Sequence, residues 1–167
     1  MNDIQNQSAP RNPAMLPRAW EDMSFDEQGD HLLSLLNGGR GNRAVGVIYY
    51  IACTDSGRLK IGFTTGSVKK RLAQLQTGSS SELRIIAERP GTIDDEAALH
   101  ASFAKNWLRG EWFEMSEHIF DHICSVIWCA ASIYAKRGAT PPHWLRAGIC
   151  MLEDTYGGLP PEYLAMT

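Results

Sequence analysis

Three polar side chains, Tyr49, Lys60 and Arg71, follow one another at intervals of eleven residues. An arginine guanidinium can pair with two phosphate oxygens at once, and a lysine ammonium neutralises charge as a point source. A tyrosine hydroxyl exchanges protons, but at a pKa of about 10 only roughly 0.1% is phenolate at pH 7, unless a nearby cation raises that fraction. These residue types can bind an anionic group such as a phosphate, if the fold brings them together.

A β-hairpin is predicted to position the first two of these residues. The runs VGVIYYIA at 45–52 and LKIGF at 59–63 are strand-like, and a turn, Thr-Asp-Ser-Gly-Arg, separates them. Side chains alternate between the two faces of a strand, so Tyr49 and Tyr50 point in opposite directions. The spacing to Lys60 favours Tyr49, although either ring also suits an ordinary strand position.

A helix is expected to carry the arginine. The segment 64–67, Thr-Thr-Gly-Ser, offers an N-cap, and 68–76 has helical periodicity. Arg71 lies at the edge of the apolar stripe of this helix, where it can lean over the sheet toward Tyr49 and Lys60. The alternative is a surface arginine whose aliphatic stem merely covers the stripe. The stripe consists of Val68, Leu72 and Leu75.

A second helix, expected over 95–106, places Glu96, Leu99, His100 and Phe103 on one face. A carboxylate among apolar side chains loses hydration, and a divalent cation would compensate for that loss. The alternative is that Glu96 simply favours the helix macrodipole in the first turn. His100, one turn later, could approach the same site or be a satisfied core histidine.

The order of Tyr49, the Lys60-Ile-Gly run and Arg71 resembles the GIY-YIG nuclease superfamily. The glutamate–histidine helix and the run Glu-Trp-Phe at 111–113 resemble a phage-associated branch with KIG in place of YIG. The resemblance covers about residues 45–116.

Two features depart from the pattern of that superfamily. Val47 occupies the slot of the glycine in "GIY", and no asparagine is obvious after the glutamate helix where some members use one. Lysine in place of the second tyrosine is shared with the branch that this chain resembles. Without that asparagine, the sequence identifies no residue for one side of the predicted active site.

The resemblance implies a metal-dependent endonuclease that hydrolyses phosphodiester bonds in DNA with one metal ion, Mg²⁺ or Mn²⁺. In this scheme Glu96 holds the metal and Arg71 holds the scissile phosphate. Tyr49 helps to deprotonate the attacking water, Lys60 orients that water or neutralises the phosphate, and His100 assists proton transfer. Two alternatives remain open: a nuclease-derived nucleic-acid-binding module without catalysis, and a protein-interaction module whose terminal helices dock a partner.

Charge is unevenly distributed along the chain. The formal net charge is −3 and the pI about 5.9, which argues against a strongly basic nucleic-acid binder. The segment 58–89, however, holds seven basic and two acidic residues. Such a local positive surface attracts phosphates, so Arg58, Lys69 and Lys70 are expected to contact the substrate.

The predicted fold class is α+β: a small GIY-YIG-like domain with a three-stranded, mainly antiparallel sheet flanked by helices, plus helical extensions at both ends. Residues 1–41 are expected to be a partly disordered extension with a short helix at 25–36. The domain spans 42–137, with a third strand at 83–87 and a helix at about 117–136. A C-terminal helical extension, 138–167, includes a helix from about Pro142 to Glu153.

The four cysteines form no Cys-x-x-Cys pair, which disfavours a zinc site. The most apolar stretch, 123–135, is too short to cross a bilayer, and the N-terminus has no apolar signal core. These features predict a cytoplasmic protein with reduced thiols and no membrane contact. The expected partner is DNA, and no pattern in the sequence specifies an oligomeric state.

Overall fold

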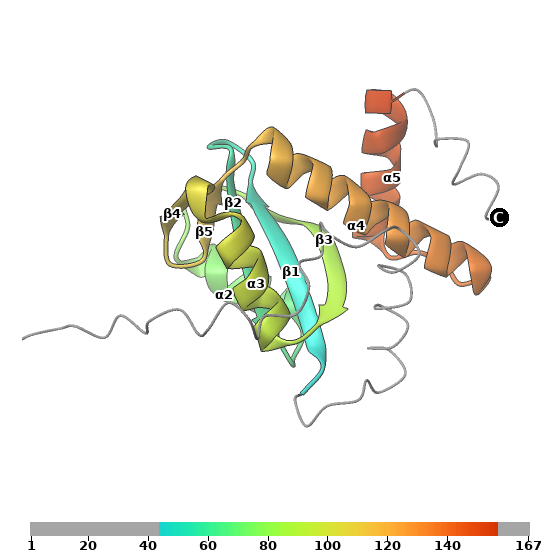
Figure 1. The fold of residues 1–167 in the computed structure, drawn as a ribbon, viewed down its shortest axis with the longest axis horizontal. Helices are drawn as coiled ribbons and strands as arrows, with labels where there is room; N and C mark the ends of the chain where they lie inside the picture. Colours follow the sequence, from blue (N-terminus) through green and yellow to red (C-terminus); the bar gives the residue numbers. More distant parts are fainter. Residues whose placement is uncertain (1–43, 157–167) are drawn as a thin grey trace, which may run out of the picture.

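The sheet is built around the predicted hairpin. The computed structural model describes residues 44–156, and Figure 1 shows the two strands of this hairpin side by side. The two strands are antiparallel, and Tyr49 pairs with Gly62. The helix expected at 25–36 lies outside the described residues. The elements in chain order are β1 (Gly46–Cys53), β2 (Arg58–Thr64), α2 (Val68–Thr77), β3 (Leu83–Gly91), α3 (Ile93–Ser102), the 3₁₀ turn η3 (Ala104–Asn106), β4 (Trp107–Arg109), β5 (Trp112–Glu114), α4 (Glu117–Lys136) and α5 (His143–Tyr156).

The α+β class is confirmed, but the prediction of three strands is wrong. The antiparallel sheet has five strands in the order β3-β1-β2-β5-β4. The two additional strands come from the segment 107–114, where Gly110 turns the chain with φ +54°. Strands of three residues are too short to show the alternation by which a strand is identified in a sequence.

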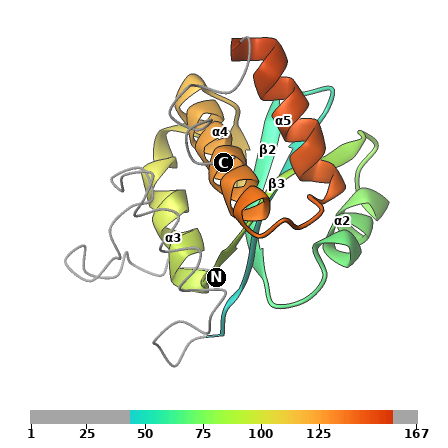
Figure 2. The ribbon, with the colours of Figure 1, turned by 90° about the vertical axis from the view of Figure 1, so that its right-hand side faces the viewer.

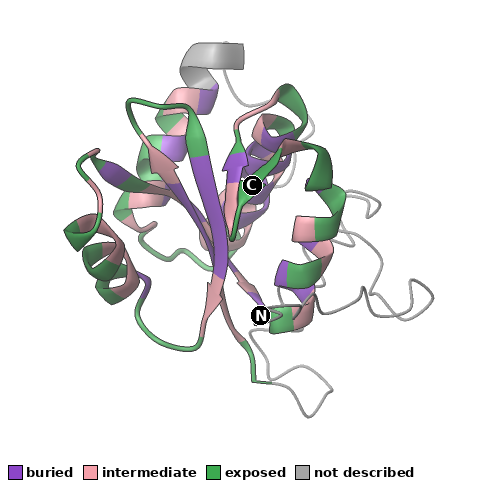
Figure 3. Ribbon diagram, turned by 90° about the vertical axis from the view of Figure 1, so that its left-hand side faces the viewer, coloured by how far each residue is buried: buried purple, intermediate pink, exposed green. Residues whose placement is uncertain are grey.

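The two faces of the sheet carry different helices. Tyr49 and Ile51 of β1 face α2, while Ile48 and Tyr50 face the core shared with α3, α4 and α5. Figure 2 shows α2 and α3 on opposite sides of the sheet, and Figure 3 shows buried residues along the central strands. Neighbouring residues of β1 therefore serve two separate cores, as strand alternation requires.

The helix ends follow local capping chemistry. Ser67 caps α2, Gly78 ends it as its C-cap, and Thr92 caps α3 in a capping box with Asp95. Helix α3 stops at Ser102, four residues before the predicted end, because the chain tightens into a 3₁₀ turn after the buried Phe103.

Strand β3 continues to Gly91, beyond the predicted end at Ala87, even though Pro90 lies within it. Proline is tolerated there because β3 is an edge strand that pairs only with β1. Helix α4 has the predicted bounds, and α5 packs against both α4 and β3. The helix that follows the predicted domain is thus packed onto it.

By length and composition alone, α4 is the one described helix that could cross a membrane, and half of its apolar stretch is buried inside the protein. The helix has 20 residues, whereas the sequence suggested an apolar stretch of thirteen. Val126 and Ile127 of α4 lie in the core with Leu145 of α5. This packing is that of a core helix.

Candidate active site at the edge of strand β2

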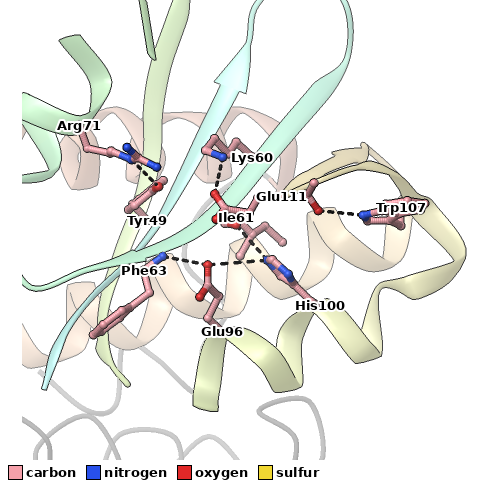
Figure 4. A network of polar contacts seen from close by, with 10 residues as sticks. Tyr49, Lys60, Ile61, Phe63, Arg71, Glu96, His100, Trp107 and Glu111 are labelled. Atoms are coloured by element: carbon pink, nitrogen blue, oxygen red, sulfur yellow. Dashed lines mark hydrogen bonds and ion pairs between the residues drawn. The ribbon is translucent and has the colours of Figure 1, made fainter. Parts of the chain in front are cut away.

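Arg71 and Tyr49 are in direct contact, as predicted. The Arg71 Nε–H donates a hydrogen bond to Tyr49 Oη at 3.2 Å (Figure 4). The half-buried arginine reaches down from the first turns of α2, and Tyr49 rises from the face of the sheet that α2 covers. Because the guanidinium occupies a lone pair of the phenol oxygen, the tyrosine keeps its own proton for another partner.

The pKa of Tyr49 is determined mainly by burial rather than by its cationic neighbour. Burial raises the pKa of Tyr49 above its ordinary value, and this effect outweighs the hydrogen bond from Arg71, which lowers it. The charges of Glu111 and Glu96 raise the pKa further. The phenol is therefore protonated at neutral pH, and the expected gain of phenolate from neighbouring cations does not occur in the protein alone.

Tyr50 faces the other side, as alternation predicts. Its hydroxyl lies 2.7 Å from His122 Nε2 in the buried core, on the face of the sheet opposite to α2 and Arg71. The ambiguity between the two tyrosines is thus resolved in geometry: Tyr49 alone lies beside the arginine.

Lys60 lies on the same face as Tyr49 and is almost fully buried, with 6% of its surface exposed. Its ammonium forms an ion pair and hydrogen bond with Glu111, which comes just before β5. The ammonium also lies 5.7 Å from the centre of the Trp112 ring, within the range of a cation–π contact. These two neighbours hold a buried cation beside the arginine–tyrosine pair.

Two backbone groups of β2 extend beyond the end of β5. The Ile61 N–H still reaches the carbonyl of Glu111 at 3.1 Å, but the Ile61 carbonyl and the Phe63 N–H have no strand partner on that side. Helix α3 supplies both missing partners. Glu96 Oε1 accepts from Phe63 N at 3.1 Å, and His100 Nε2 bonds to Ile61 O at 2.9 Å (Figure 4).

These contacts explain how α3 orients its polar residues. A carbonyl oxygen only accepts, so the bond to Ile61 assigns the proton to His100 Nε2. The same nitrogen lies 4.0 Å from Glu96 Oε1, which is too long for a hydrogen bond. Edge-on packing of the His100 ring against Phe113, at 5.0 Å between centroids, fixes the imidazole further.

Burial raises the pKa of Glu96, and the charge of Glu111 adds to the rise, while His100, Phe63 and Lys60 oppose it. A buried carboxylate with a raised pKa gains from a cation, so Glu96 suits a divalent ion. Among the described residues, no three His, Cys, Asp or Glu side chains form a metal cage. Mg²⁺ commonly uses one or two carboxylates and completes its shell with water and phosphate oxygens, so this donor set fits it.

The predicted substrate-contacting residues lie at the surface around these groups. Lys69 and Lys70 are exposed on α2 beside Arg71, and the charge of Lys69 lowers the raised pKa of the half-buried Glu88. Arg58 is exposed at the start of β2, two residues before Lys60 on the same face. All three are therefore surface residues on the elements that carry Lys60 and Arg71.

Glu111 is the residue whose role the sequence left undecided. In the structure it pairs with the buried Lys60. Its charge also acts on Tyr49, Arg71 and Glu96. In the sequence, Glu111 is marked only by its place directly before Trp112. Its link to Lys60 becomes visible only when β5 pairs with β2, which places Trp112 opposite Lys60.

Comparison with known proteins supports a nuclease-like domain. Residues 46–128 match the model of the T5orf172 domain, a phage-associated domain with a nuclease-like fold. This range contains all residues of the candidate site. No curated protein and no solved structure matches the chain.

Proposed function

We propose that this protein, whose residues 46–128 match the T5orf172 domain, is a metal-dependent endonuclease of the GIY-YIG type that hydrolyses phosphodiester bonds in DNA. The proposal rests above all on one arrangement of residues from four different elements: Arg71 bonds to Tyr49, and the charge of Glu96 acts on both of them. The charge of Lys60 in turn acts on Glu96. Phosphodiester hydrolysis replaces one oxygen on phosphorus by the oxygen of water. Positively charged hydrogen-bond donors and a carboxylate that can bind a metal ion suit this reaction.

Arg71 would hold the scissile phosphate. Its Nε–H is taken by Tyr49, which leaves the two terminal NH₂ groups for two phosphate oxygens. The bond to Tyr49 also fixes the direction of the guanidinium before substrate arrives, so less side-chain entropy is lost on binding. Lys60, held by Glu111, would neutralise charge that develops on the same phosphate.

Glu96 would bind one Mg²⁺ or Mn²⁺. Its Oε1 is oriented by the Phe63 N–H, and its second oxygen is the one we assign to the cation. A bound divalent ion lowers the pKa of its water and stabilises negative charge on phosphate oxygens. His100 supports this arrangement by fixing the edge of β2, and a role in proton transfer would require its Nε2–H to leave the Ile61 carbonyl.

Tyr49 would act as a protonated hydrogen-bond donor. Because its pKa is raised and Arg71 already donates to its oxygen, the hydroxyl keeps its proton and can donate a hydrogen bond to the attacking water or to a phosphate oxygen. This role orients the nucleophile. It replaces the phenolate base expected from the resemblance, since forming that base would cost more here than in water.

Incubation of the purified protein with supercoiled plasmid tests the proposal. We expect nicked and linear products with Mg²⁺ or Mn²⁺, none with EDTA, and none from the Glu96→Gln variant. An RNA of matching sequence, run in parallel, determines whether DNA is the preferred substrate. Absence of cleavage by the wild-type protein under all metal conditions would contradict the proposal.

The second candidate is a nucleic-acid-binding module without chemistry. The specific observation in its favour is the Lys60–Glu111 pair, in which a carboxylate already neutralises one cation of the site. Salt-sensitive retention of DNA without cleavage would support this candidate. A protein that neither binds nor cuts nucleic acid would instead favour a protein-interaction module.

A further inference from the structure

We propose that Trp107 is a stacking platform for an unpaired nucleobase of the bound strand, so that the preferred substrate contains unstacked bases. This inference rests on the proposed action on nucleic acid. It concerns the β4–β5 hairpin, which the mechanism above uses only through Glu111.

Trp107 is conspicuous for its exposure. The indole is 55% exposed and its neighbour Leu108 is 42% exposed, on an edge strand whose three residues all face solvent. The Trp107 Nε1–H donates to the Gly110 carbonyl at 2.8 Å. This bond fixes the ring and satisfies its only polar group, so a rigid apolar surface is presented to water.

The hairpin joins this ring to the candidate active site. Trp107 lies opposite Phe113 in the β4–β5 pairing, and the Phe113 ring packs edge-on against His100. On the other side of the turn, Gly110 is followed by Glu111, which holds Lys60. Figure 4 shows Trp107 beyond Glu111 and on the same side of the sheet edge as His100.

Charge beside the ring identifies the partner. Lys105 and Arg109 lie two residues before and two residues after Trp107, and both are exposed. Exposed aromatic surface between cations is the arrangement with which proteins bind single strands, where bases stack on rings and phosphates meet basic groups. A polyanion with flat apolar faces fits this surface better than an acidic peptide, which lacks the stacking groups.

Duplex DNA offers few free base faces. A base inside a duplex is already stacked on both sides, and unstacking it costs a few kcal/mol. A single strand, flap or bubble presents such faces without that cost. Trp107 would therefore discriminate between nucleic-acid forms while the site itself binds phosphate in either form.

The test is equilibrium binding in EDTA, where no cleavage is expected, with a labelled single-stranded oligonucleotide and the duplex of the same sequence. We expect Trp107→Ala to weaken single-strand binding about tenfold or more and to leave duplex binding almost unchanged. Trp107→Phe should retain an intermediate affinity. Ile93→Ala is the matched control, because Ile93 is equally exposed at 52% and lies at the start of α3.

Wild-type affinity of Trp107→Ala for the single strand would overturn this inference, as would equal losses for single strand and duplex. Neither result affects the proposed endonuclease. Conversely, a wild-type protein that binds single strands through Trp107 but never cuts DNA would contradict the proposed catalysis alone. Circular dichroism of each variant verifies that the fold is retained.

Discussion

Tyr49 lies directly over Gly62, its cross-strand partner. A Cβ atom added to Gly62 would be 2.3 Å from Tyr49 Oη and 2.5 Å from Tyr49 Cζ. Real Cβ atoms do not approach so closely, so only glycine leaves room for the ring. The glycine of the Lys-Ile-Gly run thus allows the tyrosine to lie across the strand and bring its hydroxyl to Arg71.

Gly62→Ala is expected to displace the phenol. The overpacking should lower the free energy of unfolding by about 1–3 kcal/mol and reduce cleavage by the protein that remains folded. Chemical denaturation and a cleavage assay measure the two effects. Gly66→Ala is the control, since its added Cβ would be an ordinary 3.6 Å from Thr64 Oγ1. A Gly62→Ala protein with wild-type stability would show that the ring does not occupy this position.

The two adjacent tyrosines should respond oppositely to loss of the hydroxyl. Tyr49→Phe keeps the ring but removes the partner of Arg71, and we expect cleavage to fall about 100-fold with little change in stability. Tyr50→Phe removes the buried bond to His122, which should cost about 1 kcal/mol of stability and leave cleavage unchanged. Thermal unfolding and initial cleavage rates test both variants; an exchange of the two phenotypes would refute the assignment of Tyr49 to the site.

Lys60 and Glu111 should behave as one unit. Glu111→Gln leaves a buried ammonium without its counter-charge and is expected to cost about 3 kcal/mol, more than Lys60→Met, because the Glu111 carboxylate remains partly exposed to water. Each single variant should cut DNA more slowly than the wild type. The double variant should cut no more slowly than the less active of the two single variants.

The control for this cycle is Glu82→Gln, which breaks the exposed pair with Arg84. Exposed pairs contribute about 0–1 kcal/mol, so stability and cleavage should barely change. Additive losses in the Lys60 and Glu111 variants would indicate that the two side chains act independently.

Glu96→Gln should alter how stability depends on pH. Burial raises the pKa of Glu96 in the folded protein, so between the ordinary value of about 4.3 and the raised value the folded state binds more protons than the unfolded state. In that window stability falls as pH rises, and above it the loss persists. The variant should therefore be more stable than the wild type at neutral pH in EDTA.

Thermal unfolding over a pH series measures this difference. The gain should shrink as pH falls below the raised pKa, and Mn²⁺ should stabilise the wild type but not the variant. If the melting temperatures of the two proteins change with pH in parallel, burial does not raise the pKa of Glu96. If Mn²⁺ stabilises both proteins equally, Glu96 is not the metal-binding carboxylate.

The chain's local patterns predicted the central hairpin, the helix with Arg71 and the bounds of α4, because each has a clear period or cap. Contacts that depend on strand order were not predictable. Nothing in the spacing of Lys60 and Glu111, 51 residues apart, indicates that β5 joins β2. The raised pKa of Tyr49 was not predictable either, since burial causes it and burial depends on α2 packing over the strand.

The most direct test of the account is single-turnover cleavage of DNA in Mn²⁺ by Arg71→Ala. Arg71 joins Tyr49 to the proposed phosphate site, so we predict a loss of about 1,000-fold or more, with partial recovery in Arg71→Lys. Gln74→Ala, exposed on the same helix, should cut at the wild-type rate. Cleavage by folded Arg71→Ala at the wild-type rate would contradict the central claim that this arginine and its neighbours form an active site for phosphodiester hydrolysis.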